Sequence, residues 1–400
     1  MTFSLETIRA AAARIAGAVL RTPTVPCPAL SRLLGTELFL KLDNLQPTGA
    51  FKERGAANRI AQLAAAERAA GVIAMSAGNH AQAVARHAAL AGIAATIVMP
   101  RFTPATKVVR TEAWGAKVVL HGESLAEAAA HAHHLATAEG LIFIHPYDDP
   151  AVIAGQGTLA LEMLEDAPAI AAMAIPVGGG GLLTGCAAAA LALKPGIAIY
   201  GVEVEGYPAM AQRLAGRPIS VGGPTIAEGI AVRDVGELPF RWLREHGIEI
   251  LVVSERAVEQ AIALLAEGAK VVAEGAGAAA LAAVLEHPAR FAGKPTGLPV
   301  CGGNIDARAL SNVLLRQLLR DGRMLRLRFD IPDRPGMLAD IAARIAALGG
   351  NVIEVQHQQL FNAPTVQSTE LYLMVEVRDA AQGEGILAAL RAGDYAVRRV

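Results

Sequence analysis

Hydrophobic residues between positions 37 and 306 fall into short continuous runs that alternate with longer segments of helical periodicity. Residues 71–76, 94–99 and 116–120 are such runs and predict buried strands, and residues 79–90 predict the helix that joins the first two. This alternation indicates an α/β fold with a mostly parallel sheet that helices cover on both faces. Because ligands bind beyond the carboxyl ends of the strands in such sheets, we expect the chemistry in the loops that follow the strands.

The pattern changes after a domain boundary that we place at residues 321–322. Six segments follow in the order strand, helix, strand, strand, helix, strand, which is the ferredoxin-like βαββαβ arrangement. These segments are residues 324–330, 334–350, 352–360, 369–377, 380–391 and 395–400. We therefore expect two domains, residues 1–321 and residues 322–400.

One uncharged stretch, residues 167–193, exceeds the roughly 20 residues that a membrane-spanning helix needs. Its interior argues against a span, because Pro176 and the glycines at 178–181 would break a helix there. The stretch is better explained as a short apolar strand followed by a separate alanine-rich helix, so we expect no membrane segment.

The charges balance, with 36 Lys and Arg against 37 Asp and Glu and a formal net charge of −1. Nucleic-acid binding needs clustered, uncompensated basic residues, so small molecules or copies of the same chain are the expected partners. The three cysteines, Cys27, Cys186 and Cys301, lie far apart in the sequence and lack the spacing of a zinc site. They favour a reducing, cytoplasmic location.

The first candidate for chemistry is Lys52, which lies in the segment 47–55 between a predicted strand and a helix. A lone lysine is usually a solvated surface group. Here Gly49, Phe51 and Gly55 flank it and suit a close-packed pocket. A desolvated lysine has the lowered pKa that Schiff-base chemistry requires.

The second candidate is the segment Ser76-Ala77-Gly78-Asn79-His80, which follows a predicted strand and opens a helix. The unpaired N–H groups of a helix start favour an anion. The same segment could be a capped turn with Ser76 or Asn79 as the helix cap, and the two interpretations are compatible. Asn79 also offers an amide for a ring oxygen.

The third candidate is the run of four glycines, Gly178 to Gly181, between a predicted strand and a helix. Bare backbone can approach phosphate oxygens, and a helix start lies behind it. The dinucleotide pattern G-x-G-x-x-G would need a glycine where Leu183 or Thr184 stands, and no Gly-Lys-Ser/Thr closes a P-loop. This argues against an NAD-binding oxidoreductase and predicts a different phosphate-bearing ligand.

A lysine that can form an imine and a phosphate-binding glycine loop are the minimum of a pyridoxal phosphate site. These motifs and Cys301-Gly-Gly-Asn-Ile-Asp306 occur in the order, and at about the spacing, of the fold-type II pyridoxal phosphate enzymes, which the chain resembles. Within that family it is similar to the threonine ammonia-lyases, and its tail resembles an ACT regulatory domain. The resemblance implies two open parallel-sheet subdomains followed by a ferredoxin-like βαββαβ ACT domain.

The resemblance also implies a role for each motif. Lys52 carries pyridoxal 5'-phosphate as an imine and Phe51 contacts it, Asn79 faces the ring hydroxyl, and Cys301 faces the ring nitrogen. The phosphate is assigned to Gly178, Gly179, Gly180, Gly181 and Leu182, and the substrate carboxylate to Ser76, Ala77, Gly78, Asn79 and His80. Many relatives carry serine at the position of Cys301. A neutral group there favours elimination over transamination, because it leaves the ring a weaker electron sink.

The expected activity is the elimination of water from L-threonine, and also from L-serine, to give a 2-oxo acid and ammonia. Rival activities are serine racemase and 3-hydroxyaspartate ammonia-lyase, and the alternative outside enzymology is a catalytically idle amino-acid sensor. Ala77 stands where serine racemases, which resemble this chain, carry a serine. A homo-oligomer, dimer or tetramer, is expected, with an amino-acid effector at residues 333–336 of the ACT domain.

No metal site is expected. His131, His133 and His134 lie on an alanine-rich helix without a carboxylate at ligand spacing. Some relatives use a carboxylate at the position of Glu203 to bind a cation, but Ala209 replaces the second acidic ligand of the divalent type. A monovalent cation at Glu203 stays open.

Overall fold

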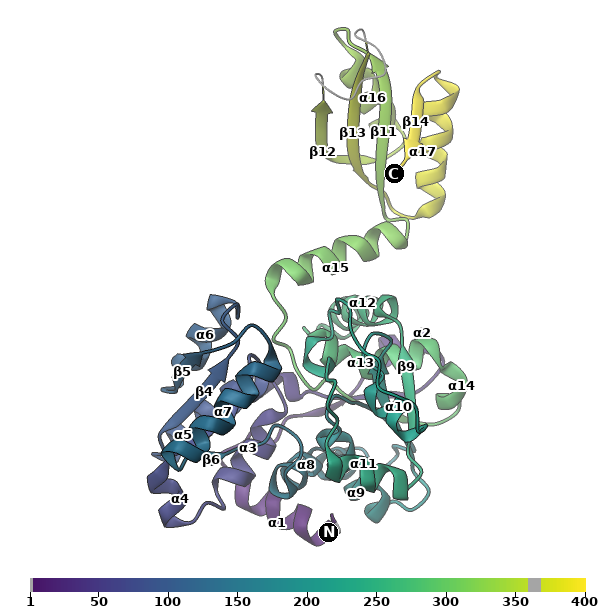
Figure 1. Cartoon of the computed structure of the whole chain (residues 1–400). Helices are drawn as coiled ribbons and strands as arrows, with labels where there is room; N and C mark the ends of the chain where they lie inside the picture. The colour runs from purple at the N-terminus through teal and green to yellow at the C-terminus, as the bar shows by residue number, and fades with distance from the viewer. Residues whose placement is uncertain (1–2, 359–367) are drawn as a thin grey trace. The chain divides into compact units, whose positions relative to one another are not determined.

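The computed structural model describes residues 3–358 and 368–400. The chain forms two compact units, Met1–Ile305 and Asp306–Val400 (Figure 1). The second unit thus includes helix α15 (Ala307–Arg320), whereas the boundary predicted at 321–322 lies after this helix. That boundary stays a prediction.

The larger sheet of the first unit has six strands, of which the edge strand β1 alone runs antiparallel to its neighbour. In spatial order they are β1 (Thr24–Pro26), β2 (Leu38–Lys41), β10 (Thr296–Pro299), β7 (Ala172–Pro176), β8 (Ala198–Val204) and β9 (Glu249–Val253). Because β10 pairs with both β2 and β7, the loops after these three strands leave the sheet side by side at its carboxyl edge.

The smaller sheet is fully parallel, in the order β5 (Lys117–Leu120), β4 (Ala95–Met99), β3 (Val72–Met75) and β6 (Ile142–Phe143). Helices cover both of its faces, because alternate strand residues enter two different cores. Val72 and Ala74 pack with helices α3 (Lys52–Ile60) and α5 (Asn79–Leu90), whereas Ile73 packs with helix α7 (Leu125–Glu139). The predicted parallel strands and the helix at 79–90 are confirmed.

Fourteen α-helices lie in the described part of the first unit. They are α1 (Leu5–Ile15), α2 (Pro28–Leu34), α3 (Lys52–Ile60), α4 (Ala65–Ala70), α5 (Asn79–Leu90), α6 (Ala105–Glu112), α7 (Leu125–Glu139), α8 (Pro150–Asp166), α9 (Gly181–Leu193), α10 (Ala209–Leu214), α11 (Glu237–Glu245), α12 (Glu255–Leu264), α13 (Gly275–Glu286) and α14 (Pro288–Phe291). Three further helical segments are η1 (Asp43–Leu45), η2 (Glu228–Ile230) and η3 (Leu265–Ala269).

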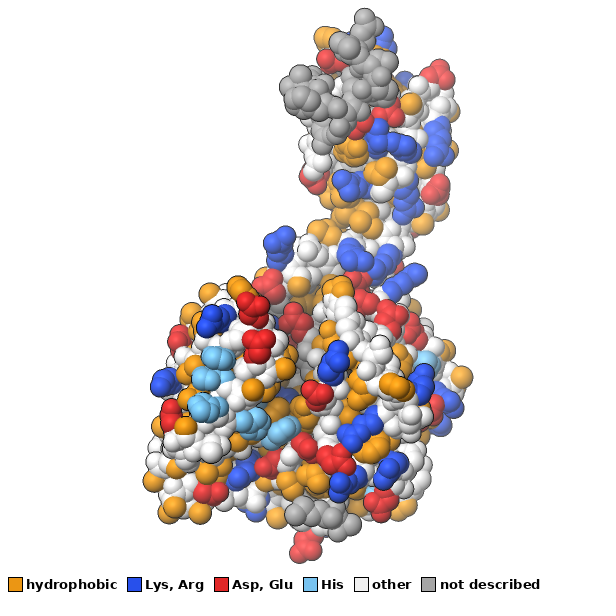
Figure 2. All heavy atoms as spheres, in the orientation of Figure 1, with side chains coloured by type: hydrophobic (Ala, Val, Ile, Leu, Met, Phe, Trp, Pro, Cys, Tyr) orange, Lys and Arg blue, Asp and Glu red, His pale blue; other side chains and the backbone are white. Residues whose placement is uncertain are grey.

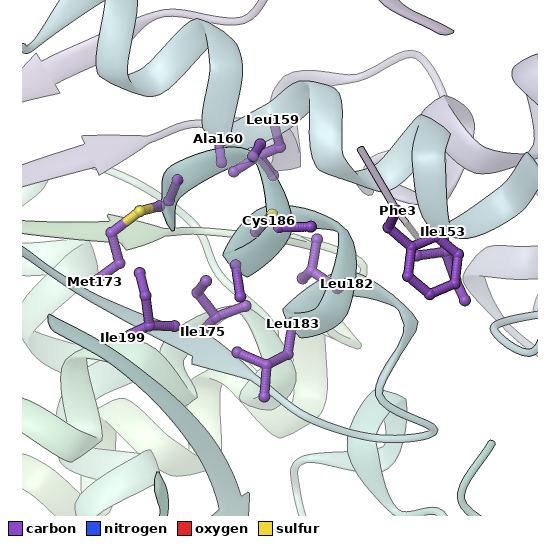
Figure 3. Close-up of a cluster of buried hydrophobic side chains, with 14 of the residues drawn as sticks. Phe3, Ile153, Leu159, Ala160, Met173, Ile175, Leu182, Leu183, Cys186 and Ile199 are labelled. Atoms are coloured by element: carbon purple, nitrogen blue, oxygen red, sulfur yellow. The ribbon is translucent and has the colours of Figure 1, made fainter. Parts of the chain in front are cut away.

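Helices α8 and α9 pack closely in a hydrophobic core that Figure 3 shows around Cys186. Their approach requires glycine: a Cβ on Gly185 would lie 2.2 Å from the carbonyl oxygen of Ile153. The uncharged stretch that contains α9 is divided as predicted, with β7 ending at Pro176 before the helix begins. Within the described residues, no helix has both the length and the apolar character needed to cross a membrane.

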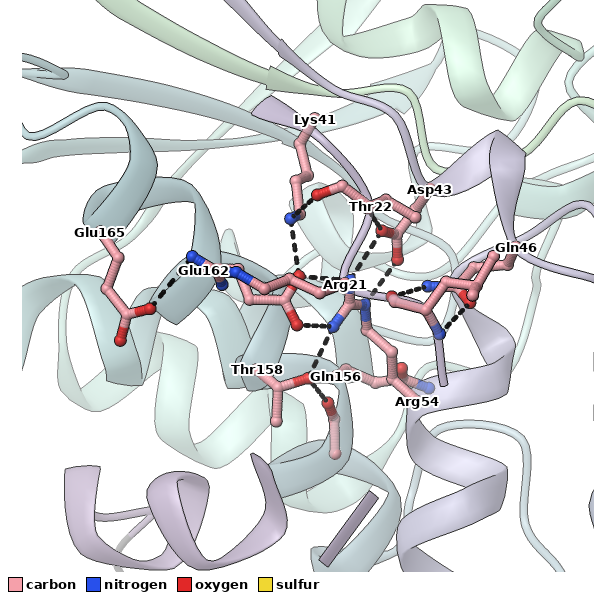
Figure 4. Close-up of polar contacts among 12 residues, drawn as sticks. Arg21, Thr22, Lys41, Asp43, Gln46, Arg54, Gln156, Thr158, Glu162 and Glu165 are labelled. Atoms are coloured by element: carbon pink, nitrogen blue, oxygen red, sulfur yellow. Dashed lines mark hydrogen bonds and ion pairs between the residues drawn. The ribbon is translucent and has the colours of Figure 1, made fainter. Parts of the chain in front are cut away.

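A buried ion-pair network anchors helix α3, which begins at Lys52, to η1, β2 and α8 (Figure 4). Arg54 donates to both carboxylate oxygens of Asp43, at 2.6 and 2.9 Å, and to both of Glu162, at 2.7 and 2.8 Å. Lys41 reaches Glu162 at 2.6 Å. Both charges of the Arg54–Asp43 pair are fully buried, so removing either side chain would leave the other as an unpaired charge inside the protein.

The second unit has its own core around Leu327, Phe329 and Leu373. Its antiparallel sheet has the order β12-β13-β11-β14. After α15 the elements are β11 (Met324–Pro332), α16 (Met337–Ala347), β12 (Asn351–Gln358), β13 (Ser368–Glu376), α17 (Ala380–Ala392) and β14 (Ala396–Arg399). The βαββαβ order is as predicted, and the last two residues of the strand expected at 352–360 lie outside the described residues.

Candidate active site

The loops that follow β2, β3, β7 and β10 carry the residues singled out in the sequence. Hydrogen bonds join three of these loops directly. The N–H of Phe51 donates to the carbonyl of Cys301 at 2.9 Å. The side chain of Asn304 donates to the carbonyl of Thr48 at 2.7 Å and to the Oδ1 atom of Asn79 at 2.8 Å. The structure therefore brings the Lys52, Asn79 and Cys301 segments together.

Lys52 is the first residue of α3 and is half-buried. Its Nζ atom donates a hydrogen bond to the carbonyl of Pro146 at 2.8 Å and lies 5.1 Å from the ring centre of Phe51. Burial lowers the pKa of the Lys52 amine to about 8, with Cys301 acting in the opposite direction. An amine with this pKa is partly neutral near physiological pH, as a nucleophile or a general base must be.

The turn before Lys52 is held by the buried carboxylate of Glu53. This carboxylate accepts the N–H of Thr48 at 3.0 Å and contacts the side chains of Arg86 and His87. Gly49, inside the turn, has a φ of +75°, and a Cβ there would lie 2.6 Å from Asn304. The turn thus depends on a glycine and on a buried acid that follows the lysine directly.

The glycine loop between β7 and α9 forms a cradle of bare backbone. A Cβ on Gly179 would lie 2.2 Å from the ring of Tyr147, and one on Gly180, whose φ is +95°, would lie 2.6 Å from Pro239. Helix α9 begins at Gly181, so its first N–H groups are free of intrahelical partners. Leu182 lies buried in the next position. This arrangement suits a phosphate group.

The segment 76–80 leaves β3 and enters α5, but neither Ser76 nor Asn79 caps the helix, so that interpretation is wrong. The cap residue is Gly78, and no side chain bonds to the first turn. The Ser76 hydroxyl instead accepts the N–H of Gly78 at 3.1 Å, and the Asn79 amide is held by Glu274 and Asn304. Ala77 is half-buried. The first-turn N–H groups of α5 therefore have no side-chain cap.

His80 lies inside the protein below this turn. Its Nε2 atom is 2.9 Å from the carbonyl of Ile144, a geometry in which Nε2–H donates. Burial lowers the pKa of the imidazole to about 3, and the charge of Lys52 adds to this effect. His80 is therefore neutral, and its Nδ1 atom has no hydrogen-bond partner within the described part of the chain.

Cys301 follows β10 and is buried. Its Sγ atom lies 3.5 Å from the carbonyl of Ala276, to which the thiol donates. Burial, reinforced by the charge of Glu274, raises the pKa of the thiol well above its usual value. The group is a neutral thiol at working pH.

The sequence analysis assigned no role to three residues of this region, Tyr147, Glu274 and Asn304. The Tyr147 hydroxyl donates to the carbonyl of Asp234 at 2.6 Å and its ring covers Gly179, but no motif marks it. Asn304 stands in the Cys301–Asp306 motif and could have been found there. Glu274 directly precedes a glycine- and alanine-rich helix, and this position at a helix start is the only feature of the sequence that could have drawn attention to it.

Residues outside this cluster have structural roles. The Glu203 carboxylate accepts the N–H groups of Met210 and Ala211, at 2.8 and 2.9 Å, and burial raises its pKa to about 7. Histidine side chains gather on one face of the first unit (Figure 2), where His121 stacks on His131 at 3.8 Å. Among the described residues, no group of three or more His, Cys, Asp or Glu is arranged to hold a metal ion.

The residues present fit pyridoxal phosphate. The amine of Lys52 matches its aldehyde, and the bare backbone at Gly179 to Gly181, where a Cβ would collide with neighbours, matches its phosphate. The neutral Cys301 thiol and the Asn79 amide are polar groups of the kind that can bond to a ring nitrogen and a ring hydroxyl.

Comparison with known proteins agrees with this geometry. The family described as "Pyridoxal-phosphate dependent enzyme" matches residues 15–302, and the ACT domain family matches residues 325–392. The L-threonine ammonia-lyase of Thermotoga maritima is 41% identical over 399 residues, which cover 99% of each chain. The crystal structure of a threonine deaminase from T.th. has 42% identity and a TM-score of 0.71, over 76% of this chain and 99% of that one. Maize serine racemase has 35% identity and a TM-score of 0.74, over 79% and 98%.

Proposed function

The chain belongs to the pyridoxal-phosphate-dependent enzyme family and carries an ACT domain, and from this premise we propose that it is an L-threonine ammonia-lyase. It converts L-threonine to 2-oxobutanoate and ammonia, with L-serine as a second substrate that gives pyruvate. The observation that carries the proposal is the Lys52 amine, with a pKa of about 8, held in one cluster with the neutral Cys301 thiol. The full-length similarity to an L-threonine ammonia-lyase selects the substrate.

Each part of the cofactor has a partner in this proposal. Lys52 anchors pyridoxal phosphate, the backbone of Gly178 to Leu182 holds the phosphate, and Phe51 packs against it. Asn79 takes the ring hydroxyl and Cys301 the ring nitrogen. When bound, the cofactor supplies an electron sink that stabilises negative charge at the substrate α-carbon.

The protein's own groups then handle the substrate and its protons. The N–H groups of residues 76–80, at the start of α5, bind the substrate carboxylate. The Nζ atom of Lys52 becomes a free amine when the amino group of the substrate takes its place, and it would then take the α-proton, for which its lowered pKa makes it available at neutral pH. The β-hydroxyl leaves as water once Lys52 returns a proton to it, and the released unsaturated amine hydrolyses to the 2-oxo acid and ammonia.

Elimination is favoured over the two rival outcomes by two side chains. The Cys301 thiol stays protonated and neutral, so it does not add a charge that would favour transamination. Racemisation needs an acid on the face that Lys52 cannot reach, and the methyl group of Ala77 cannot donate a proton. The first observation separates the proposal from transamination, and the second separates it from serine racemase.

Regulation and location are parts of the same proposal. Helix α16 starts after Gly336, and a hollow beside it is lined by Pro332, Arg334, Met337 and His357. We assign an amino-acid effector to this turn, and a homo-oligomer of two or four copies to the assembly. All three cysteines are free and buried, which fits the cytoplasm.

The test is a substrate comparison with the purified protein loaded with pyridoxal phosphate. L-Threonine, L-serine and 3-hydroxyaspartate are supplied separately, and 2-oxo acids, ammonia and serine enantiomers are quantified. The proposal expects L-threonine to give the highest kcat/KM and D-serine to form far more slowly than pyruvate. Higher kcat/KM with 3-hydroxyaspartate, or D-serine at the rate of pyruvate, would replace it with the corresponding rival.

A further inference from the structure

The side-chain amide of Asn79 is fixed at both ends. Its Nδ2 atom donates to Glu274 Oε1 at 2.6 Å, and its Oδ1 atom accepts from Asn304 at 2.8 Å. The same Nδ2 atom of Asn304 donates to the carbonyl of Thr48, which can only accept. The backbone at Thr48 therefore determines which end of Asn304 faces Asn79, and this in turn directs the Asn79 NH₂ group to Glu274. One hydrogen of that NH₂ group remains for another acceptor.

The side chain of Glu274 bonds to Asn79 and does not cap the helix that Glu274 precedes. It occupies the cap position of α13, yet its side chain makes no cap hydrogen bond. Its N–H donates to the carbonyl of Gly302 at 3.0 Å, and a Cβ on Gly302 would lie 2.2 Å from Glu274 Oε1. The carboxylate thus lies over bare backbone directly after Cys301, in the loop that faces Asn79.

The charged and polar surroundings of Glu274 come from several elements. Burial raises its pKa to about 7, while the Asn79 amide, Lys107 of α6 and the N–H of Asn304 lower it and Glu228 of η2 raises it. The neutral thiol of Cys301 is also close enough to respond to its charge. When ionised, the carboxylate can only accept hydrogen bonds, so it cannot receive the Oδ1 end of Asn79.

We propose that Glu274 is a positioning residue that acts through Asn79. Its carboxylate holds the Asn79 amide in one orientation, so that the remaining Nδ2 hydrogen serves the ring hydroxyl oxygen of the bound cofactor. This inference rests on the proposed function, because the partner of Asn79 is the cofactor. It predicts that the contribution of Glu274 depends on Asn79.

A double-mutant cycle between Glu274→Gln and Asn79→Ala tests this dependence. Glutamine carries no charge and presents an NH₂ group where one carboxylate oxygen stood, so it is a weaker acceptor for Asn79 Nδ2 and can also donate to the Oδ1 end of Asn79. Asn79 then loses a charged hydrogen-bond partner, and the cost of such a loss corresponds to a factor of about ten or more. Glu274→Gln should therefore lower kcat with L-threonine about ten-fold or more. It should change KM less than about two-fold, and in the Asn79→Ala background it should change kcat less than about two-fold.

Two readouts besides turnover accompany the cycle: the visible absorbance of the loaded protein, which reports the ring hydroxyl, and the dissociation constant of the cofactor from titration of the cofactor-free protein. Both should change in Glu274→Gln, and in both the double variant should match the Asn79→Ala variant. Glu249→Gln is the matched control, since Glu249 is 42% exposed and pairs with Arg290, not with Asn79. It should leave all three readouts within about two-fold of the unsubstituted protein.

The inference is overturned if the effect of Glu274→Gln persists in full in the Asn79→Ala background, or if the absorbance of Glu274→Gln is unchanged. Glu274→Ala in the same cycle gives the answer if the glutamine variant does not fold. Failure of the proposed function is distinguishable, because the unsubstituted protein would then form no 2-oxobutanoate from L-threonine. The absorbance and cofactor titrations would still decide the role of Glu274.

Discussion

The lowered pKa of Lys52 can be measured directly as a reactivity. The amine has a pKa of about 8, against an ordinary lysine value of 10.5, because burial disfavours its charged form. At pH 7 about 10% of an amine with a pKa of 8 is neutral, against about 0.03% for an ordinary lysine. Lys52 should therefore present about 300 times more neutral amine than an unburied lysine at this pH.

The assay is the rate at which the cofactor-free protein forms a reducible adduct with pyridoxal phosphate. The adduct is trapped with borohydride at intervals, from pH 6 to pH 10, and the peptide that contains Lys52 is quantified by mass spectrometry. Nα-Acetyl-lysine is measured at every pH with the same aldehyde, so that the titration of the aldehyde cancels in the ratio. Exposed Lys117 serves as an internal reference.

The direction of the pH dependence follows from the titration of the Lys52 amine. Only the neutral form reacts, so the rate should rise about ten-fold per pH unit below pH 8 and level off above it. The ratio to acetyl-lysine should be largest at low pH and fall between pH 8 and pH 10. A rate that keeps rising to pH 10, parallel to acetyl-lysine, would refute the reasoning from burial. Lys52→Arg is the control in which this peptide should stay unlabelled.

Three further predictions concern other residues. Cys301→Ser should retain most of the elimination activity, because both groups are small and neutral, whereas Cys301→Asp should slow elimination and increase transamination; an inert serine variant would exclude a role at the ring nitrogen. Arg54→Met leaves the buried carboxylate of Asp43 without its main partner and should lower the free energy of unfolding in urea by about 3 to 5 kcal/mol. The matched variant Arg21→Met removes exposed ion pairs and should cost less than about 1 kcal/mol, so equal losses would contradict the argument. Truncation after Asp321 should leave turnover but abolish its response to branched-chain amino acids, and an unchanged response would remove the regulatory role of the tail.

The parallel sheets could be predicted because they depend on local pattern. Buried parallel strands are short apolar runs, and Pro176 with the following glycines marks the end of one such strand. The position of β10 between β2 and β7 could not be predicted, because it joins segments more than a hundred residues apart in the sequence. Arg54 likewise looks like a solvated helical residue until its distant partner Glu162 is placed beside it.

The candidate site divides in the same way. Lys52 and the glycine run could be singled out from the sequence, because the glycines that flank the lysine and the four successive glycines before a predicted helix are local patterns. The capping role considered for Ser76 was wrong because the hydroxyl bonds to Gly78 within the turn. Glu274 carries no motif of its own, and its role follows only from the tertiary contact with Asn79.

The most direct test of the central claim is the formation of 2-oxobutanoate from L-threonine by the loaded protein and by its Lys52→Ala variant. Lys52 begins α3 at the end of a loop and lies outside the hydrophobic cores, so the variant should fold with an unchanged thermal midpoint. The account predicts equal amounts of 2-oxobutanoate and ammonia from the unsubstituted protein, and less than a few per cent of that rate from the variant. No 2-oxobutanoate from the unsubstituted protein, or comparable rates from both proteins, would contradict it.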